Sequence, residues 1–180
     1  VLARDALVTH ELEAATSRLR RYDRDGTPRG EFPLPSLGSV AGLDAEENGD
    51  RIVAGHSSFA MPPSLFVFEV TTMPRHSLAP LPLPSGFDPA AIEVRQVRYP
   101  STDGTPISMF LVSRAGILPN GQNPTVLTGY GGFNISIGPH FDPALPAWLQ
   151  QGGILAVPNL RGGGETLGPR PETETIVEAA

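Results

Sequence analysis

The sequence contains no cysteine and no lysine among its 180 residues. The absence of cysteine excludes disulfides, thiolate nucleophiles and cysteine zinc sites, and leaves the compartment open. All 13 permanently cationic side chains are arginines, scattered along a chain whose formal net charge is -6. Because nucleic-acid binding needs clustered cations for phosphate contacts, we expect no nucleic-acid partner.

The chain also lacks a long apolar run, and no basic region followed by an apolar stretch opens it. A membrane-spanning helix needs about 20 apolar residues, so we expect no membrane association. A cytoplasmic location is the default expectation, with a periplasmic one left open. Since the sequence opens at Val1 rather than methionine, we expect either processing or excision from a longer polypeptide.

Several catalytic and ligand-binding motifs are missing. The sequence has no GxSxG nucleophile elbow, no GxxxxGK[ST] phosphate loop, no GxGxxG fingerprint and no HExxH zinc motif. Its histidines are isolated from one another, so we expect no metal and no cofactor; they are His10, His56, His76 and His140. Ser39 and Ser136 lie near glycines without the context of an elbow, which favours hydroxyl hydrogen bonding over catalysis.

The first part of the sequence predicts short antiparallel strands. Asp25-Gly26 and Asn48-Gly49 are strong turn signals because these residue types tolerate positive φ. The almost wholly apolar run 65–70 predicts a strand buried on both faces. Groups of four strands fit either a sandwich or one to two blades of a propeller. The strands are expected at 6–13, 17–23, 38–43, 51–58 and 64–70.

A proline-rich stretch at 73–93 predicts a domain linker, since proline removes backbone donors. The sequence after it predicts a strand–loop–helix–strand unit, which is typical of α/β domains with functional loops at the strand ends. The expected elements are strands at 94–99, 106–113, 125–128 and 154–160, and a helix at 143–150.

The most informative stretch is Gly129–Ser136, which reads GYGGFNIS directly after a buried strand. Flanking glycines leave the phenol of Tyr130 unhindered, so its hydroxyl can donate to a developing oxyanion. From the residues alone, a tight strand-to-helix turn with a partly buried aromatic is the better explanation of the stretch. The glycines that follow Arg161 resemble a phosphate loop only superficially, because they are contiguous and lack a lysine.

The chain resembles prolyl oligopeptidase, a serine peptidase of family S9. The resemblance lies in YPSTDG from Tyr99, NPT from Asn123, GYGGFNIS from Gly129, and NLRGGGE from Asn159. It implies α/β plus all-β architecture: a partial α/β-hydrolase domain preceded by the last blade or blades of a β-propeller. The implied parts are the C-terminal part of the propeller (1–72), the linker (73–93), the start of the catalytic domain (94–165) and a divergent tail (166–180).

The resemblance implies an endopeptidase that cuts short peptides after proline. Tyr130 matches the tyrosine that forms half of the oxyanion hole, and Phe133 matches an aromatic that lines the proline pocket. No position of this chain matches the nucleophile, the acid or the catalytic histidine, which the family carries further downstream. The expected partners are therefore short proline-containing peptides and the missing C-terminal catalytic segment.

Three alternatives stay open beside this hypothesis: a non-catalytic peptide-binding module, an oligopeptidase B-like peptidase, and a complete esterase-like hydrolase, which the missing elbow disfavours most. The sequence departs from the family after Glu165 and at Pro158, which lies inside an expected strand and is expected to mark its end.

Overall fold

The computed structural model describes residues 1–80, 82–83, 85–118 and 120–163. The chain divides into two compact units. The first contains Val1–Ser85 together with Gly138–Asp142, and the second contains Gly86–Ile137 and the residues from Pro143 onward. The predicted tail at 166–180 lies outside the described residues.

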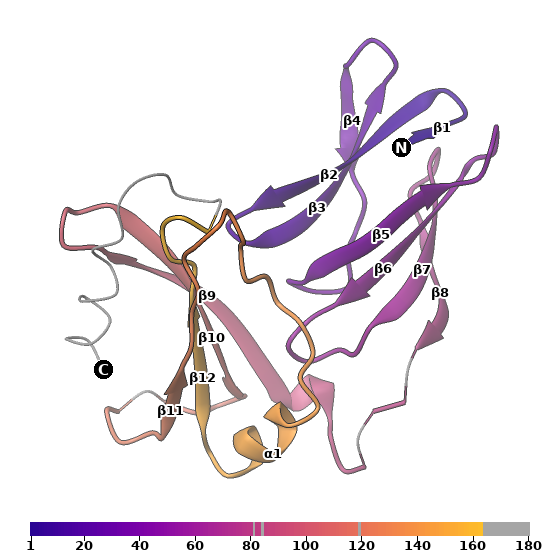
Figure 1. The fold of residues 1–180 in the computed structure, drawn as a ribbon. Helices are drawn as coiled ribbons and strands as arrows, with labels where there is room; N and C mark the ends of the chain where they lie inside the picture. The colour runs from indigo at the N-terminus through magenta and orange to yellow at the C-terminus, as the bar shows by residue number, and fades with distance from the viewer. Residues whose placement is uncertain (81, 84, 119, 164–180) are drawn as a thin grey trace. The chain divides into compact units, whose positions relative to one another are not determined.

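The first unit contains two four-stranded antiparallel sheets (Figure 1). In the first sheet the strands lie in chain order, and the turn signal at Asp25-Gly26 is confirmed because the Asp25 carboxylate accepts the Thr27 amide at 2.9 Å. The sequence missed the two short outer strands. The strands are β1 (Leu2–Ala3), β2 (Ala6–Glu13), β3 (Thr16–Asp23) and β4 (Pro28–Glu31).

The second sheet also follows chain order, with β5 (Ser39–Ala45), β6 (Arg51–Ser57), β7 (Ser64–Glu69) and β8 (Arg75–Pro80). The predicted linker at 73–93 is therefore wrong in its first part, because β8 occupies it. Proline is tolerated in this strand because β8 is an edge strand and Pro80 ends it. Later in the same stretch, Pro89–Ala91 forms a short 3-10 helix (η1) whose first turn is capped by Asp88.

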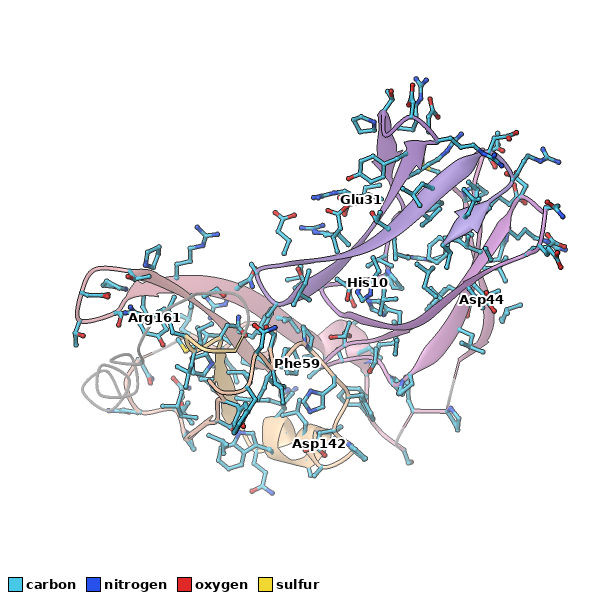
Figure 2. The ribbon with its side chains drawn as sticks, turned by 45° about the horizontal axis from the view of Figure 1, so that its top comes forward. His10, Glu31, Asp44, Phe59, Asp142 and Arg161 are labelled. Carbon is cyan, nitrogen blue, oxygen red and sulfur yellow. The ribbon has the colours of Figure 1, made fainter. Side chains whose placement is uncertain are left out.

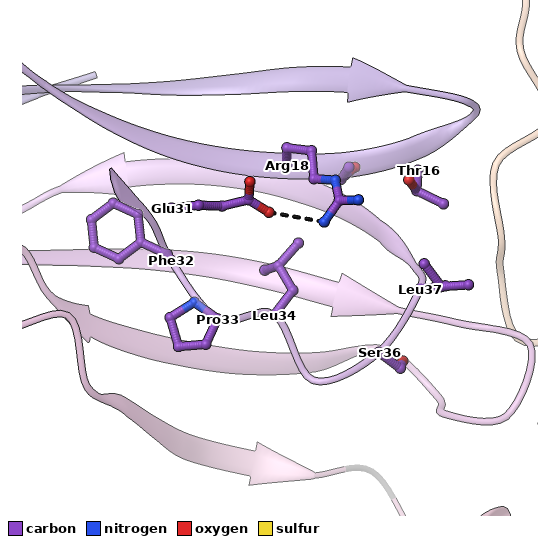
Figure 3. A pocket seen from close by; sticks show the side chains of 9 residues that line it. Thr16, Arg18, Glu31, Phe32, Pro33, Leu34, Ser36 and Leu37 are labelled. Atoms are coloured by element: carbon purple, nitrogen blue, oxygen red, sulfur yellow. Dashed lines mark hydrogen bonds and ion pairs between the residues drawn. The ribbon is translucent and has the colours of Figure 1, made fainter. Parts of the chain in front are cut away.

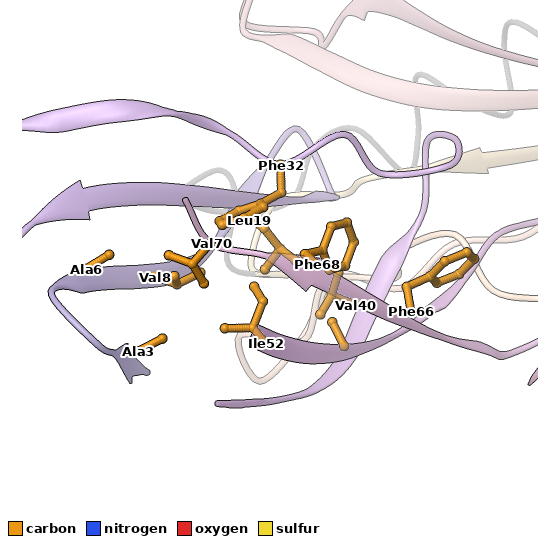
Figure 4. Packing of buried hydrophobic residues seen from close by; sticks show 11 residues of the cluster. Ala3, Ala6, Val8, Leu19, Phe32, Val40, Ile52, Phe66, Phe68 and Val70 are labelled. Atoms are coloured by element: carbon orange, nitrogen blue, oxygen red, sulfur yellow. The ribbon is translucent and has the colours of Figure 1, made fainter. Parts of the chain in front are cut away.

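The core of the first unit lies between its two sheets (Figure 4). Val8 and Leu19 of the first sheet and Ile52 of the second are fully buried, and the rings of Phe32 and Phe68 meet edge to face at 5.6 Å. The remaining members are Ala3, Ala6, Val40, Ala54, Phe66 and Val70.

Strand β7 is buried on one face only, which corrects the expectation of burial on both. Phe66 and Phe68 point into the core, whereas Leu65, on the opposite face, is 48% exposed. Side chains alternate across a strand, and within the first unit only one face of this sheet packs against the other sheet. An apolar run alone could not show which of its faces is covered.

A buried histidine makes the stability of the first unit dependent on pH. His56 is 2% exposed, its Nε2 lies 3.2 Å from the Ser36 carbonyl oxygen, and burial lowers its pKa below the ordinary value. Burial also lowers the pKa of His10. Because the unfolded chain binds a proton first, the stabilising contribution is present above about pH 6.5 and is lost as the pH falls through the lower folded value.

We therefore expect urea-unfolding midpoints to fall between pH 7.5 and pH 5, and the fall to be smaller in His56→Gln. His76→Gln, at a side chain that is 62% exposed, controls for the effect of a His→Gln substitution on stability at pH 7.5. A fall of equal size in wild type and His56→Gln would contradict the assignment.

The second unit contains a mixed four-stranded sheet in the order β11-β12-β10-β9. β9 and β10 form a long antiparallel hairpin, and β11 runs parallel to β12 at the other edge. Among the described residues of this unit the regular secondary structure is mostly strand, with α1 as the single α-helix. The elements are β9 (Ile92–Pro100), β10 (Pro106–Arg114), β11 (Thr125–Leu127), α1 (Leu145–Gln150) and β12 (Ile154–Pro158).

The helix α1 connects the two parallel strands and begins two residues later than predicted. Leu145 and Leu149 are buried, as the apolar pattern indicated. The indole of Trp148 donates to the Ile154 carbonyl at 3.0 Å, which joins the helix to the start of β12. Strand β12 ends at Pro158, two residues earlier than expected, because proline has no backbone N–H to donate.

Within the described residues, no helix is long and apolar enough to cross a membrane.

Candidate functional site

The stretch from Gly129 to Ser136 is a loop that leaves the carboxyl end of β11. The Thr128 amide still bonds to Ala156 of β12 at 3.0 Å, so the loop begins at the edge of the sheet. Phe133 and Asn134 adopt left-handed φ values of 51° and 58°. These values form a turn that the Ile135 amide closes on the Gly132 carbonyl at 3.0 Å. The strand and its tight turn thus place the aromatic residues of the loop outside the sheet.

The phenol of Tyr130 is half-buried and lies over Gly132. The side chain is 39% exposed, and a β-carbon at position 132 would lie 3.1 Å from the Tyr130 hydroxyl. Gly132 therefore leaves room for the phenol to fold back over the loop. Within the described part of the chain, no residue hydrogen-bonds to this hydroxyl, so it is an available donor.

Phe133 lies three residues further along the same loop and is 90% exposed. Ile135 is 54% exposed. Large apolar side chains concentrated at a loop tip are typical of surfaces that contact another molecule. The two residues predicted to form the site, Tyr130 and Phe133, thus share one loop and both reach solvent.

A second loop, residues 159–163 at the end of β12, supports the first. The Gly162 carbonyl accepts the Asn134 amide at 3.0 Å, and the Gly163 carbonyl accepts the Ser136 hydroxyl. Ser136 therefore makes a structural hydrogen bond, as expected. Asn159 holds the base of this loop to β10, with its amide group 2.8 Å from the Ser108 hydroxyl and its backbone N–H 2.9 Å from the Ser108 carbonyl oxygen.

Arg161 ties the second loop to the β9–β10 hairpin (Figure 2). Its side chain is only 5% exposed, and its guanidinium donates to both carboxylate oxygens of Asp103 at 2.7 Å and to the Ser101 hydroxyl at 2.9 Å. Hydrogen bonding to Arg161, aided by the Thr105 amide, holds the pKa of Asp103 well below its usual range. Gly162 and Gly163 thus belong to a loop fixed by a bidentate ion pair.

A pocket of about 270 Å³ lies in the first unit and contains neither predicted site residue (Figure 3). Arg18 and Glu31 pair across it at 2.9 Å, so their charges already neutralise each other. Its lining is Thr16, Ser17, Arg18, Glu31, Phe32, Pro33, Leu34, Ser36 and Leu37. The aromatic loop of the second unit is the stronger candidate, because its donor has no partner among the described residues.

The other residues considered from the sequence, His140 and Ser39, lie outside the aromatic loop. His140 is exposed, and its Nδ1 lies 3.1 Å from the Gly138 carbonyl oxygen. Ser39 lies in β5 of the first unit. Among the described residues no group of three or more acidic or histidine side chains is arranged to hold a metal ion. The sequence singled out Arg161 but gave no sign of its partner, because the register of β10 and β12 brings Asp103 to it.

Residues 2–79 match the family model of the prolyl oligopeptidase N-terminal β-propeller domain. Prolyl endopeptidase from Elizabethkingia miricola is 36% identical over 154 residues, covering 86% of this chain and 22% of that protein. Prolyl oligopeptidase A from Amanita bisporigera is 54% identical over 81 residues, covering 44% of this chain and 11% of the relative. The chain thus spans about a fifth or less of the length of these relatives.

Solved structures are similar to this chain as well. A structure from a study of two prolyl endopeptidases superposes with a TM-score of 0.80 at 34% identity, covering 92% of this chain and 24% of the other. Prolyl oligopeptidase B from Galerina marginata, bound to a 35mer hydrolysis and macrocyclization substrate, gives a TM-score of 0.79 at 28% identity, covering 90% of this chain and 23% of the other. Both similarities extend over the two units.

Proposed function

Because this chain is prolyl oligopeptidase-like and residues 2–79 carry its β-propeller part, we propose that it belongs to a serine-type endopeptidase that hydrolyses short peptides after proline. In this proposal the chain carries the oxyanion-hole loop and the Ser/Asp/His triad lies in a C-terminal catalytic segment outside it. The available hydroxyl of Tyr130 is the observation that carries the proposal.

The second unit is, in this proposal, the first part of an α/β-hydrolase domain. Its support is the β11–α1–β12 connection, since two parallel strands joined by a helix form the basic α/β unit. Functional loops of such units follow the carboxyl ends of the strands, and both loops of the site do so.

Tyr130 serves as a donor to the oxygen of the scissile carbonyl. When a nucleophile attacks this carbonyl, negative charge develops on the oxygen, and a donor already in place stabilises the transition state more than the ground state. Within the described residues the Tyr130 hydroxyl makes no hydrogen bond, so none has to be broken before it donates to the substrate. Gly132 lies next to the phenol and has no side chain, which leaves the phenol room to approach a substrate.

Phe133 contributes an apolar surface for the proline ring. The exposed phenyl group lies three positions from the donor, so one loop supplies both the apolar contact and the oriented hydrogen bond. Binding sites for small apolar groups combine these two features. Without nucleophile, base and acid, the chain by itself retains binding contacts and no turnover.

A chimaera tests this proposal. Residues 1–163 replace the matching part of the prolyl endopeptidase from Elizabethkingia miricola, whose remaining sequence supplies the missing segment. We expect the folded chimaera to hydrolyse a chromogenic peptide after proline and the present chain alone to leave it intact. Turnover by the chain alone would contradict the missing triad.

The same assay separates the alternatives. A folded chimaera that binds the peptide without cleaving it would favour a non-catalytic binding module, and cleavage that does not follow proline would favour an oligopeptidase B-like peptidase. The parent endopeptidase, measured in parallel, shows that the substrate and conditions support turnover.

A further inference from the structure

The turn between β9 and β10, in the second unit, is held by its own hydrogen bonds. The Ser101 amide donates to the Thr105 carbonyl at 2.8 Å, and the Gly104 amide donates to the Ser101 carbonyl at 2.8 Å. The Thr105 amide also donates to the Asp103 carboxylate at 3.0 Å. These bonds fix the carboxylate at the end of the hairpin, where it meets the guanidinium of Arg161.

Arg161 connects this turn to the loop 159–163 of the same unit. Its side chain is 5% exposed and donates to both carboxylate oxygens of Asp103 at 2.7 Å. The base of the loop is held as well, since the Asn159 amide donates to the Ser108 carbonyl at 2.9 Å. A short loop fixed at its base by the backbone and in its middle by a bidentate ion pair has little conformational freedom.

The loop 159–163 in turn holds the aromatic loop, residues 129–136, through two backbone carbonyls. The Gly162 carbonyl accepts the Asn134 amide at 3.0 Å, and the Gly163 carbonyl accepts the Ser136 hydroxyl. The turn, the loop 159–163 and the aromatic loop therefore contact one another in series, all within the second unit.

The two loops also approach each other closely at Gly163. A β-carbon at this position would lie 3.0 Å from the Ile135 carbonyl oxygen and 3.4 Å from the Tyr130 carbonyl oxygen. A side chain here would fit only if one of the two backbones shifted. The backbone of the residue that carries the proposed donor thus rests directly on the loop that Arg161 fixes.

We propose that Asp103 and Arg161 are positioning residues for the Tyr130 hydroxyl, acting through the loop 159–163. This inference rests on the proposed function, because the hydroxyl has a catalytic role only there. A donor stabilises a developing oxyanion best when it is already in place, and a displacement of about 1 Å can lower a rate by about 10²-fold. Loosening the ion pair loosens the support of the donor.

Hydrogen exchange on the present chain tests this series of contacts without any activity. Ser101→Ala removes one hydrogen bond of the Arg161 guanidinium and leaves both charges in place. We expect the Asn134 amide to exchange severalfold faster, with the Thr128 amide of the sheet edge unchanged. Asp103→Asn also lowers the stability of the unit, so both amides should exchange faster there, Asn134 by roughly tenfold more than Thr128.

Ser113→Ala is the matched control, since Ser113 and Ser101 are both 4% exposed and lie at opposite ends of the same hairpin. The Ser113 hydroxyl bonds to the Arg114 carbonyl at 3.1 Å, so its loss should leave the Asn134 amide unchanged. Unchanged exchange at Asn134 in both test variants would overturn the proposal. Equal acceleration at the loop and at the sheet edge would also overturn it, because the ion pair would then stabilise the unit without holding the loop in particular.

The chimaera, assayed below the unfolding midpoint of each variant, adds a kinetic test. We expect Asp103→Asn to lower kcat by about tenfold with KM nearly unchanged. In a Tyr130→Phe background the same change should lower kcat no further, because the donor that it misplaces is already absent. An equal fall in both backgrounds would contradict the positioning role. Inactivity of the chimaera itself would count against the proposed function, and the exchange measurements would still decide whether the ion pair holds the loop.

Discussion

Replacing Tyr130 by phenylalanine is expected to lower the kcat of the chimaera by about 10²- to 10³-fold and to leave KM nearly unchanged, the range seen when one oxyanion-hole donor is removed. The hydroxyl is the only group lost. Since no described residue bonds to it in the free chain, its removal costs the fold little. Steady-state hydrolysis of the chromogenic proline peptide, with unfolding midpoints measured in parallel, checks this expectation.

Tyr22→Phe is the matched control for this substitution. Its hydroxyl donates to the Glu11 carboxylate at 2.9 Å within the first unit. We expect this change to leave kcat as it was. A Tyr130→Phe chimaera with full kcat would remove the oxyanion role from this residue, and a similar rise of KM in place of a fall of kcat would assign it to substrate binding.

Asp103→Asn is expected to produce a large loss of stability in the second unit. The change removes the carboxylate charge that accepts two hydrogen bonds from the guanidinium of Arg161, which is 5% exposed. Breaking a buried ion pair by changing one partner is strongly destabilising, and we expect the unfolding midpoint to fall by roughly 5–10 °C. Arg161→Met should cost less, because the group that it leaves unpaired is a half-exposed carboxylate. Thermal unfolding of both variants at pH 7 gives the order.

The ion pair between Asp103 and Arg161 also predicts a loss of stability in acid. Because the folded pKa of Asp103 is depressed, its contribution is fully present above the unfolded value near 4 and is lost as the pH falls further. The difference between wild type and Asp103→Asn should therefore shrink below pH 4. If Arg161→Met lowered the unfolding midpoint more than Asp103→Asn at pH 7, the loss of stability would not come from the buried guanidinium charge.

The strands of the first unit were predictable where hydrophobic alternation and turn residues agreed. β2 was found at its observed bounds, and β3, β6 and β7 to within one residue. β4 was missed because Pro28 and Gly30 have low strand propensity, and it is stabilised by pairing with β3. β8 was missed for a related reason. The prolines that flank it are typical of a linker, and the strand is stabilised by pairing with β7.

The candidate site was predictable only as far as the local sequence defines it. The glycines around Tyr130 predicted an exposed loop at a strand end, and the structure has that loop. The contact between Arg161 and Asp103 depends on the pairing of three strands, and residues 138–142 contact residues more than 80 positions away. Such contacts arise from tertiary packing, which a pattern of single residues does not encode.

The return of the chain to the first unit at Gly138–Asp142 affects how the protein can be divided. A shorter polypeptide that stopped at Ser85 would keep all eight propeller strands yet lack the Phe141 amide that donates to the Ser57 hydroxyl and the His140 ring beside Phe59. A polypeptide that started at Gly86 would carry those five residues with nothing to receive them. A single proteolytic cut at residue 85 would therefore divide the first unit between the two pieces.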